Sequence, residues 1–456
     1  MKIESSIFNH CVLQRNGGNV SEAVFGGATD AVGTVTIQVS RGGRVLTGFR
    51  DKKVGQAKDG RLEGWVKGVP VGGPYRIDVR VLDAVGKVVD RATITNVLVG
   101  DVWLLAGQSN MEGVARRSNA LPTHPMVRAF FMDDHWGVAR DPLHALWAAV
   151  DKVHGVIGCP ALKKDRYVGP GMAFAQEMWR LTKVPQGLIA AAHGGTSMEQ
   201  WNPGRKDEGT NSLYGAALRR VHKNGGRIAG VAWYQGESDC GAQQVELYTA
   251  RMRELVAALR RDCGNASLPW VAVQISRVVE TDSNWWNIIR EQQRQLPQTI
   301  DHLAMVPAID LTLDDAIHIG GSDINLLGRR MAQAMANLCG EKKAPRPPIR
   351  LKSVEIGQIE DNGAVEVVAT FADVVGKLVA CQRPVGFAVV NEQRSVNVVD
   401  VKLQGSKARI LTRLTLQEAA NATLYYGYGC NPVCNITDEA DRSIPAFGPV
   451  PLSATK

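Results

Sequence analysis

The first hundred residues alternate apolar and polar side chains, a pattern that is typical of half-buried β-strands. The segments GTVTIQVSR (33–41) and YRIDVRVLD (75–83) follow this period of two. Glycine and charged residues gather between such segments, as in KDGRLEG and VPVGGP, and these clusters predict turns. We therefore expect residues 1–97 to form an N-terminal β-sandwich domain with antiparallel strands.

From residue 98 onward, apolar strand-like runs alternate with amphipathic helical segments. The strand-like runs cover residues 102–106, 187–192, 228–234, 269–275 and 302–309. The helical segments cover residues 171–181, 213–223, 245–262, 285–296 and 324–338. This alternation predicts an α/β domain in which helices cover both faces of a mainly parallel sheet. We place this domain at residues 98–342.

The last part of the chain returns to short strands. The stretch EKKAPRPPIR (341–350) is basic and rich in proline, which predicts a linker. Strand-like patterns follow it, for example in AVEVVATF (364–371). We therefore expect residues 343–456 to form a C-terminal β domain.

The composition is that of an ordinary globular protein, with 45% hydrophobic and 21% charged residues in 456. The net charge is +8, but the lysines and arginines are scattered, which favours a solvated surface over nucleic-acid binding. No run of 18 apolar residues predicts a membrane span, so we expect no membrane partner. The first residues lack the apolar core of a signal peptide, so we expect a cytoplasmic protein, or a periplasmic or secreted one if a leader has been removed.

The eight cysteines form no C-x-x-C motif and no zinc-ligand spacing. Their positions allow a disulfide between Cys430 and Cys434, or between Cys263 and Cys339, but scattered free thiols fit a cytoplasmic protein better. The chain also lacks the P-loop and the strand-linked G-x-G-x-x-G motif of nucleotide-binding proteins. We therefore expect neither a metal nor another cofactor.

Polar side chains follow four of the predicted strands of the α/β domain. In a parallel sheet, ligands bind beyond the carboxyl ends of the strands, so these positions are the first candidates for a site. They are Gly107–Asn110, His193–Thr196, Gln235–Asp239 and the segment from Asp310 to His318.

These segments contain the groups that acyl transfer requires. Ser109 is the candidate nucleophile, and His318 is the candidate base. Asp315 lies three residues before His318 and is better placed than Asp314 to orient the imidazole, although either carboxylate remains open. The candidate donors to an oxyanion are the N–H groups of Ser109 and of Gly195, or of Gly194 in its place, and the side-chain amide of Gln235.

Each of these residues also has a purely structural interpretation. Ser109 alone fits a helix N-cap, and His318 alone fits a structural histidine, as His193 does. Trp201 fits either the core or a surface that stacks on a sugar ring. Glu237 fits either a catalytic carboxylate or a satisfied hydrogen-bond network. With Gln108 and Asn110, these last two residues complete our candidate substrate-binding set: Gln108, Asn110, Trp201 and Glu237.

Four motifs occur in the order GDVWLLAGQSNMEG, GGTSMEQW, GVAWYQGESD and DDAIHIGGSDINLLGRRMA. Together they resemble the sialate O-acetylesterase group of the SGNH hydrolase superfamily, which is related to carbohydrate esterase family six. The resemblance extends over nearly the whole chain, since CVLQR (11–15) and the closing YYGYGCNPVCNITDEADRSIPAF look like the same proteins. The G-x-S-x-G motif of α/β-hydrolases is absent.

The resemblance implies a flavodoxin-like three-layer α/β/α domain between two β domains, and metal-free hydrolysis of acetyl esters on sugars. By motif position Ser109 matches the nucleophile, and Asp315 and His318 match the D-x-x-H block. The glycine of GGT matches an oxyanion donor, and Gln235 stands where other members use asparagine. Two departures are Ile319, where a proline often follows the histidine, and a longer stretch NITDEADRSIP near the C-terminus.

We therefore expect a serine esterase that removes O-acetyl groups from a small-molecule or glycan substrate through an acetyl-enzyme on Ser109. Two alternatives remain open. One is an acetylxylan or other polysaccharide deacetylase with the same site, and the other is a catalytically silent carbohydrate-binding protein. A lipase or thioesterase also fits the chemistry, but no long apolar loop indicates an acyl-chain channel. The oligomeric state is left open.

Overall fold

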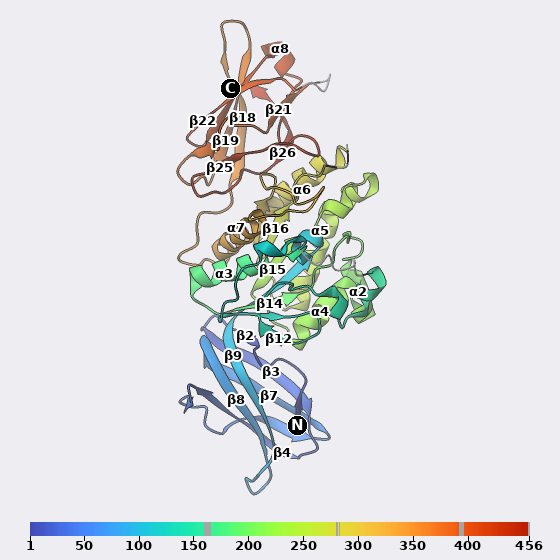
Figure 1. Cartoon of the computed structure of the whole chain (residues 1–456), viewed down its shortest axis with the longest axis vertical. Helices are drawn as coiled ribbons and strands as arrows, with labels where there is room; N and C mark the ends of the chain where they lie inside the picture. Colours follow the sequence, from blue (N-terminus) through green and yellow to red (C-terminus); the bar gives the residue numbers. More distant parts are fainter. Residues whose placement is uncertain (159–165, 280, 282, 392–395, 455–456) are drawn as a thin grey trace.

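A computed structural model describes residues 1–158, 166–279, 281, 283–391 and 396–454. Its parts follow one another along the longest axis, with the N-terminal strands at one end, the helices in the middle and the C-terminal strands at the other end (Figure 1). The chain therefore combines a mixed α/β region with separate small antiparallel sheets near the C-terminus.

The N-terminal strands pair mostly antiparallel and show the predicted alternation of buried and exposed residues. In β7, for example, every second residue from Leu62 to Val66 is buried. The strands form one continuous sheet that curls until Arg15, next to β2, bridges Ser21 of β3. They are β1 Lys2–Ile3, β2 Val12–Gln14, β3 Val20–Ala28, β4 Gly33–Arg41, β5 Arg44–Val45, β6 Lys52–Lys58, β7 Arg61–Pro70 and β8 Gly72–Leu82.

Strand β9 (Val88–Gly107) belongs to two regions at once. Its first half pairs antiparallel with β8, and its second half, from Asp101, pairs parallel with neighbours in the central sheet. The boundary predicted between residues 97 and 98 therefore falls inside an unbroken strand. Along β9 the buried residues become continuous from Val97 onward, because from that point both faces of the strand are covered.

The central sheet has the order β11-β14-β9-β15-β16-β17, and all of its neighbouring pairs are parallel. A short strand, β12 (Trp136–Val138), adds antiparallel to β11 at one edge. The five predicted strands are therefore present, and β11 is an additional one. The new strands are β11 Val127–Phe130, β14 Gln186–Ala190, β15 Gly230–Tyr234, β16 Trp270–Gln274 and β17 Leu303–Pro307.

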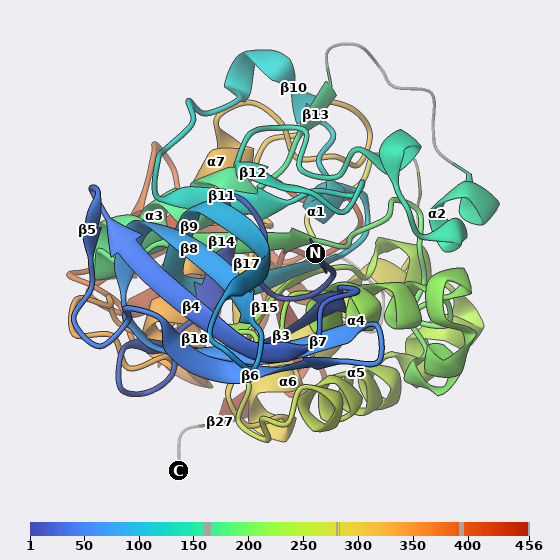
Figure 2. The same cartoon turned by 90° about the horizontal axis from the view of Figure 1, so that it is seen from below.

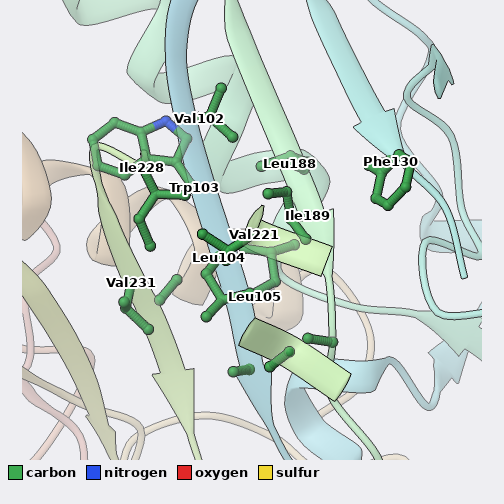
Figure 3. Packing of buried hydrophobic residues seen from close by; sticks show 14 of the residues in the cluster. Val102, Trp103, Leu104, Leu105, Phe130, Leu188, Ile189, Val221, Ile228 and Val231 are labelled. Carbon is green, nitrogen blue, oxygen red and sulfur yellow. The ribbon is translucent and has the colours of Figure 1, made fainter. Parts of the chain in front are cut away.

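Helices cover both faces of this sheet, as the sequence predicts (Figures 1 and 2). Helices α3 (Gly171–Thr182) and α7 (Asp323–Leu338) pack together on one face. On the other face lie α4 (Leu213–Lys223), α5 (Ala242–Asp262) and α6 (Trp285–Thr299). The core between the layers is apolar, and Figure 3 shows Leu104 and Leu105 of β9 beside Leu188 and Ile189 of β14. Full burial of one such side chain contributes about 1.5–3 kcal/mol.

The C-terminal strands form three small sheets around a core of their own. Arg290 of α6 is buried and donates to the carbonyl oxygens of Gly427, Gly429 and Cys430, so this region docks on the central domain through α6. The elements are β18 Arg350–Ile359, β19 Val365–Ala372, β20 Leu378–Ala380, β21 Phe387–Val390, β22 Val398–Gln404, β23 Lys407–Thr412, α8 Leu416–Ala419, β24 Thr423–Tyr426, β25 Ile436–Asp438, β26 Phe447–Pro451 and β27 Ser453–Ala454.

The cysteines of the described residues are free thiols, including the two pairs whose spacing allowed a disulfide, Cys430 with Cys434 and Cys263 with Cys339. Cys159 lies outside the described residues. In the part of the chain that the structure covers, none of the helices has the length and apolar character to cross a membrane.

Candidate active site

Strand β9 delivers Ser109 to the carboxyl edge of the central sheet through a close backbone contact. Gly107 has φ +130°, and a Cβ at this position would lie 2.1 Å from the carbonyl oxygen of Tyr234. Only glycine accepts this conformation and this approach. The N–H of Gln108 then donates to the same Tyr234 oxygen, and Ser109 begins the short helix α1 (Ser109–Glu112).

Ser109, His318 and Asp315 form one chain of hydrogen bonds. The Ser109 Oγ lies 2.9 Å from His318 Nε2, and His318 Nδ1 lies 3.0 Å from each carboxylate oxygen of Asp315. A carboxylate only accepts, so Nδ1 carries the proton and Nε2 of the neutral ring is free to accept from the serine hydroxyl. The loops that meet here are 209 residues apart in sequence.

The loop around Asp315 holds that carboxylate in its charged form. Partial burial acts to raise the pKa of Asp315, but the backbone N–H groups of Ile317 and His318 and the imidazole of His318 outweigh it and hold the pKa well below its usual range. Asp314 instead accepts from the backbone N–H of Arg116. The geometry therefore selects Asp315, and not Asp314, as the partner of the histidine.

Two backbone N–H groups are available beside the serine. The N–H groups of Ser109 and Gly195 donate to no acceptor among the described residues. Gly195 has φ +68°, and its α-carbon faces open space on the pocket side. The N–H of Gly194, the alternative donor, is already bonded at 2.6 Å to the Glu112 carboxylate. The arrangement thus favours Gly195 over Gly194.

Gln235 does not reach the pocket. Its side chain is fully buried, and its NH₂ group donates to the carbonyl oxygen of Thr196 and to Asp239. Both amide hydrogens are therefore used within the protein, and Gln235 is not among the residues that line the pocket. The prediction that this amide donates to an oxyanion is wrong, and Gln235 instead ties its own loop to the loop of Thr196.

Three of the predicted substrate-binding residues form the frame of the site. Gln108 is buried, and its side-chain oxygen accepts from the N–H groups of Gly236 and Ser238 at 3.3 Å each. Asn110 is also buried and donates to Glu237 at 2.9 Å while accepting from the N–H of Ile319 at 3.0 Å. Because Ile319 follows His318, Asn110 connects the serine helix to the histidine loop.

Glu237 lines the pocket with its carboxyl group almost fully buried. Burial raises the pKa of Glu237 to about 7, although the hydrogen bond from Asn110 opposes this shift. A carboxyl group with this pKa changes its charge near neutral pH. One carboxylate oxygen of Glu237 accepts from Asn110, and the other is buried without a hydrogen-bond partner among the described residues, so the network is only partly satisfied and both interpretations of Glu237 stay open.

Trp201 and His193 lie behind the site. Trp201 is 2% exposed, donates to the Thr196 hydroxyl and packs edge-on against Trp233, so it is a core residue, and the prediction that it binds substrate is wrong. His193 is fully buried, and its ring contacts His154 Nδ1 and the carbonyl oxygen of Gly158. Its structural interpretation is therefore the better one.

The pocket itself is a cavity of about 480 Å³ in front of Ser109 and His318. Sequence reasoning missed several of its walls, because they come from the segment between β9 and α3, where the hydrophobic pattern is weak. Arg166 from this segment donates to Asp315 Oδ2 at 2.6 Å and so extends the hydrogen-bond chain. The apolar and aromatic lining consists of Val114, Pro142, Leu146, Trp147, Tyr167 and Ile317.

Residues 99–337 match the family described as "Carbohydrate esterase, sialic acid-specific acetylesterase". The chain belongs to this carbohydrate esterase family. The matched residues contain the second half of β9, the other strands of the central sheet and every loop that contributes to the pocket.

Individual carbohydrate esterases are similar to this one. A probable carbohydrate esterase of Arabidopsis thaliana is 29% identical over 265 residues, which make up 52% of this chain and 91% of that protein. The human sialate O-acetylesterase is 25% identical over 291 residues, 56% of this chain and 52% of its own, so the chain spans about half the length of that relative. The crystal structure of a carbohydrate acetylesterase from Xanthomonas citri superposes with a TM-score of 0.71 over 98% of each chain, at 19% identity, and shows the same fold.

The bridging role of Asn110 in this esterase is testable. Asn110→Ala leaves the Ile319 N–H without its acceptor, and a buried unpaired donor costs about 1–3 kcal/mol. We expect a lower melting temperature together with a loss of esterase activity, measured on the same preparation. Asn325→Ala, a buried asparagine on α7 outside the pocket, is the matched control and should retain activity. Full activity of Asn110→Ala would contradict the role.

Proposed function

We propose that the protein is a serine esterase that removes O-acetyl groups from carbohydrates through an acetyl-enzyme on Ser109. One observation carries the proposal: the unbroken hydrogen-bond chain from Ser109 through His318 to Asp315 at the wall of a pocket. Membership in a carbohydrate esterase family supports the substrate class. In the same proposal, the five central strands other than β11 have the order β14-β9-β15-β16-β17. Numbered along the chain without β11, this order is 2-1-3-4-5, which supports a flavodoxin-like catalytic domain between two β domains.

In the first half-reaction His318 Nε2 accepts the proton of the Ser109 hydroxyl while the serine oxygen bonds to the acetyl carbonyl carbon. The resulting tetrahedral intermediate collapses by breaking the bond to the sugar oxygen, which takes the proton back from His318. Sugar leaves with a free hydroxyl, and the acetyl group stays on Ser109. In the second half-reaction a water gives a proton to His318 and its oxygen bonds to the acetyl carbonyl carbon. This second tetrahedral intermediate collapses by breaking the bond to Ser109 Oγ, which takes the proton from His318, and acetate is released.

Two backbone N–H groups can stabilise the negative charge on the oxyanion of each tetrahedral intermediate. The N–H groups of Ser109 and Gly195 have no competing acceptor among the described residues, so they are ready to donate to the oxyanion. One such donor contributes about 2.7–4 kcal/mol to the transition state. The imidazolium is stabilised by Asp315, which Arg166 and the loop N–H groups keep ionised and in place.

The pocket walls favour a ring-shaped substrate group. Trp147 is 55% exposed although it lines the pocket, and Tyr167 lines the same cavity. Exposed aromatic faces of this kind suit the apolar face of a sugar. The second candidate, deacetylation of acetylated xylan or another polysaccharide, uses the same residues and differs only in the saccharide that is accepted. A carbohydrate-binding protein without catalytic activity is less well supported, because binding alone does not require a serine that is hydrogen-bonded to a histidine.

Replacement of the serine tests the reaction class. Ser109→Ala removes the nucleophile, and we expect the rate of p-nitrophenyl acetate hydrolysis to fall by about 10⁴-fold or more. Ser197→Ala, a half-buried serine outside the pocket, is the control and should keep the wild-type rate. An active Ser109→Ala enzyme would refute the assignment, and glycan binding without hydrolysis by the wild type would favour the silent binding protein.

Replacement of the exposed tryptophan tests the saccharide contact. For Trp147→Ala we expect KM for an acetylated sugar to rise about twofold to tenfold, as the loss of an aromatic contact of about 0.5–1.5 kcal/mol implies. The kcat/KM for ethyl acetate, which has no ring, should not change. Trp65→Ala in the N-terminal sheet is the matched exposed control. Equal effects of Trp147→Ala on the acetylated sugar and on ethyl acetate would rule out stacking. Acetate release by the wild type from 9-O-acetyl sialic acid and from acetylated xylan, measured side by side, identifies the saccharide.

A further inference from the structure

Glu112, the last residue of α1, places a carboxylate inside the catalytic pocket. Its Oε2 accepts a hydrogen bond of 2.6 Å from the backbone N–H of Gly194, a length at the short end for a charged acceptor. Glu112 and Gly194 both line the pocket together with Ser109. The carboxylate is therefore bonded to the peptide unit that directly precedes the Gly195 N–H.

Gly194 is packed closely against both Glu112 and Ser109. A Cβ built on Gly194 would lie 3.0 Å from Glu112 Oε2 and 3.3 Å from Ser109 Cβ. The Gly194 backbone thus fills the space between the carboxylate and the nucleophile. A small shift of this loop would move Gly195 relative to Ser109, and a misplacement of about 1 Å can lower a rate about 100-fold.

We propose that Glu112 is a positioning residue, whose ionised carboxylate holds the Gly194 amide so that the Gly195 N–H faces the oxyanion formed on Ser109. The inference rests on the proposed function for its catalytic consequence. Ser109 and Glu112 lie on the same turn of α1, so the helix that carries the nucleophile also fixes the loop that carries the oxyanion donor.

The charge of Glu112 links this arrangement to pH. Burial raises the pKa of Glu112 to about 7, and the Gly194 N–H opposes this shift. As the pH falls through 7 the carboxyl takes up a proton, the bond to Gly194 loses its charge assistance, and the loop is held less firmly. The pKa of Glu112 in the folded protein lies above the ordinary value of 4.5, so its protonation at lower pH raises the free energy of unfolding. The loss of activity that we expect at lower pH is therefore not caused by unfolding that this group drives.

Other titratable groups face the same pocket from the surrounding elements: His144, Arg166, Tyr167, Glu237, Asp315 and His318. Burial lowers the pKa of His144 to about 4, so this ring is neutral near pH 7. Asp315 remains ionised throughout this range. Burial also raises the pKa of Glu237 to about 7, so that carboxyl group has to be tested separately. His318 is the base in every variant, so its contribution is common to all of them.

The experiment compares kcat and KM for p-nitrophenyl acetate from pH 5 to 9 in the wild type, Glu112→Ala, Glu112→Gln and Glu237→Gln. A glutamine oxygen still accepts from Gly194 but does not titrate. At pH 8 we expect Glu112→Ala to lose about 10- to 100-fold in kcat with little change in KM, and Glu112→Gln to recover most of it. The contribution of His318 cancels in the ratio of variant to wild-type kcat. This ratio should rise for Glu112→Gln as the pH falls from 8 to 6, and it should stay constant for Glu237→Gln. Glu254→Gln, an exposed glutamate on α5, is the control with an unchanged profile.

Wild-type kcat in Glu112→Ala would overturn the inference. So would a ratio of Glu112→Gln to wild-type kcat that does not change with pH, or a ratio for Glu237→Gln that rises in its place. Melting temperatures at pH 8 show whether each variant is folded, and Glu112→Gln, which lacks a buried charge, should melt no lower than the wild type.

A second readout is independent of catalysis. In a ¹⁵N-glycine-labelled sample, the amide proton of Gly194 should move upfield as Glu112 takes up its proton, with a midpoint near pH 7, and this transition should be missing in Glu112→Gln. If the wild type hydrolyses no ester, the proposed function fails while this titration still tests the contact. If the titration is absent from an active wild type, the positioning role fails and the function stands.

Discussion

The hydrogen bond between the Ser109 hydroxyl and the His318 imidazole is the contact on which the site depends. It joins the loop after β9 to the loop after β17, whose side chains meet only because both strands end at the same edge of a parallel sheet. Gly107 makes the junction possible, since its backbone passes within contact distance of Tyr234. The fold thereby places a nucleophile and a base at hydrogen-bond distance before any substrate is present.

Buried polar side chains hold the loops of the site to one another. Gln108 connects the serine loop to the loop after β15, and Asn110 connects it to the residue after His318. Gln235 joins the loop after β15 to the loop after β14. Each contact satisfies a group that would otherwise be unpaired in a medium of low dielectric constant, so the network is both stabilising and specific in geometry. Two of the carboxyl groups with a pKa near 7, Glu112 and Glu237, belong to this network.

Much of this arrangement could be predicted from the sequence. The period of the apolar residues gave the strands and helices of the central domain, and the polar residues after the strands included Ser109, Asp315 and His318, which the structure brings together. The direction of a side chain is harder to predict. Gln235 follows β15 and Trp201 follows β14, so both lie at the predicted edge of the sheet. Their side-chain N–H groups nevertheless donate to Thr196 inside the protein, a contact that the sequence pattern does not show.

The remaining differences also have physical causes. Strand β9 continues from the N-terminal strands into the central parallel strands of the same sheet, so the change of hydrophobic pattern at the predicted boundary lies inside one strand. Arg166 begins the short strand β13 (Arg166–Val168), and Trp147 lies in the one-turn 3₁₀ helix Leu146–Ala148. Elements of three residues are too short for a hydrophobic period to mark a position as facing the pocket. Glu112 is part of the GQSNMEG motif, but the sequence does not show its hydrogen bond to the Gly194 N–H, on which its proposed positioning role rests.

The central claim is that Ser109 is activated by His318, and covalent labelling measures this directly. The protein is incubated with diethyl p-nitrophenyl phosphate, digested, and mapped by mass spectrometry. The account predicts one diethylphosphoryl group, on Ser109, formed at a rate that falls by orders of magnitude in His318→Ala. Labelling of a different residue, or labelling of Ser109 at an equal rate without the histidine, would contradict it.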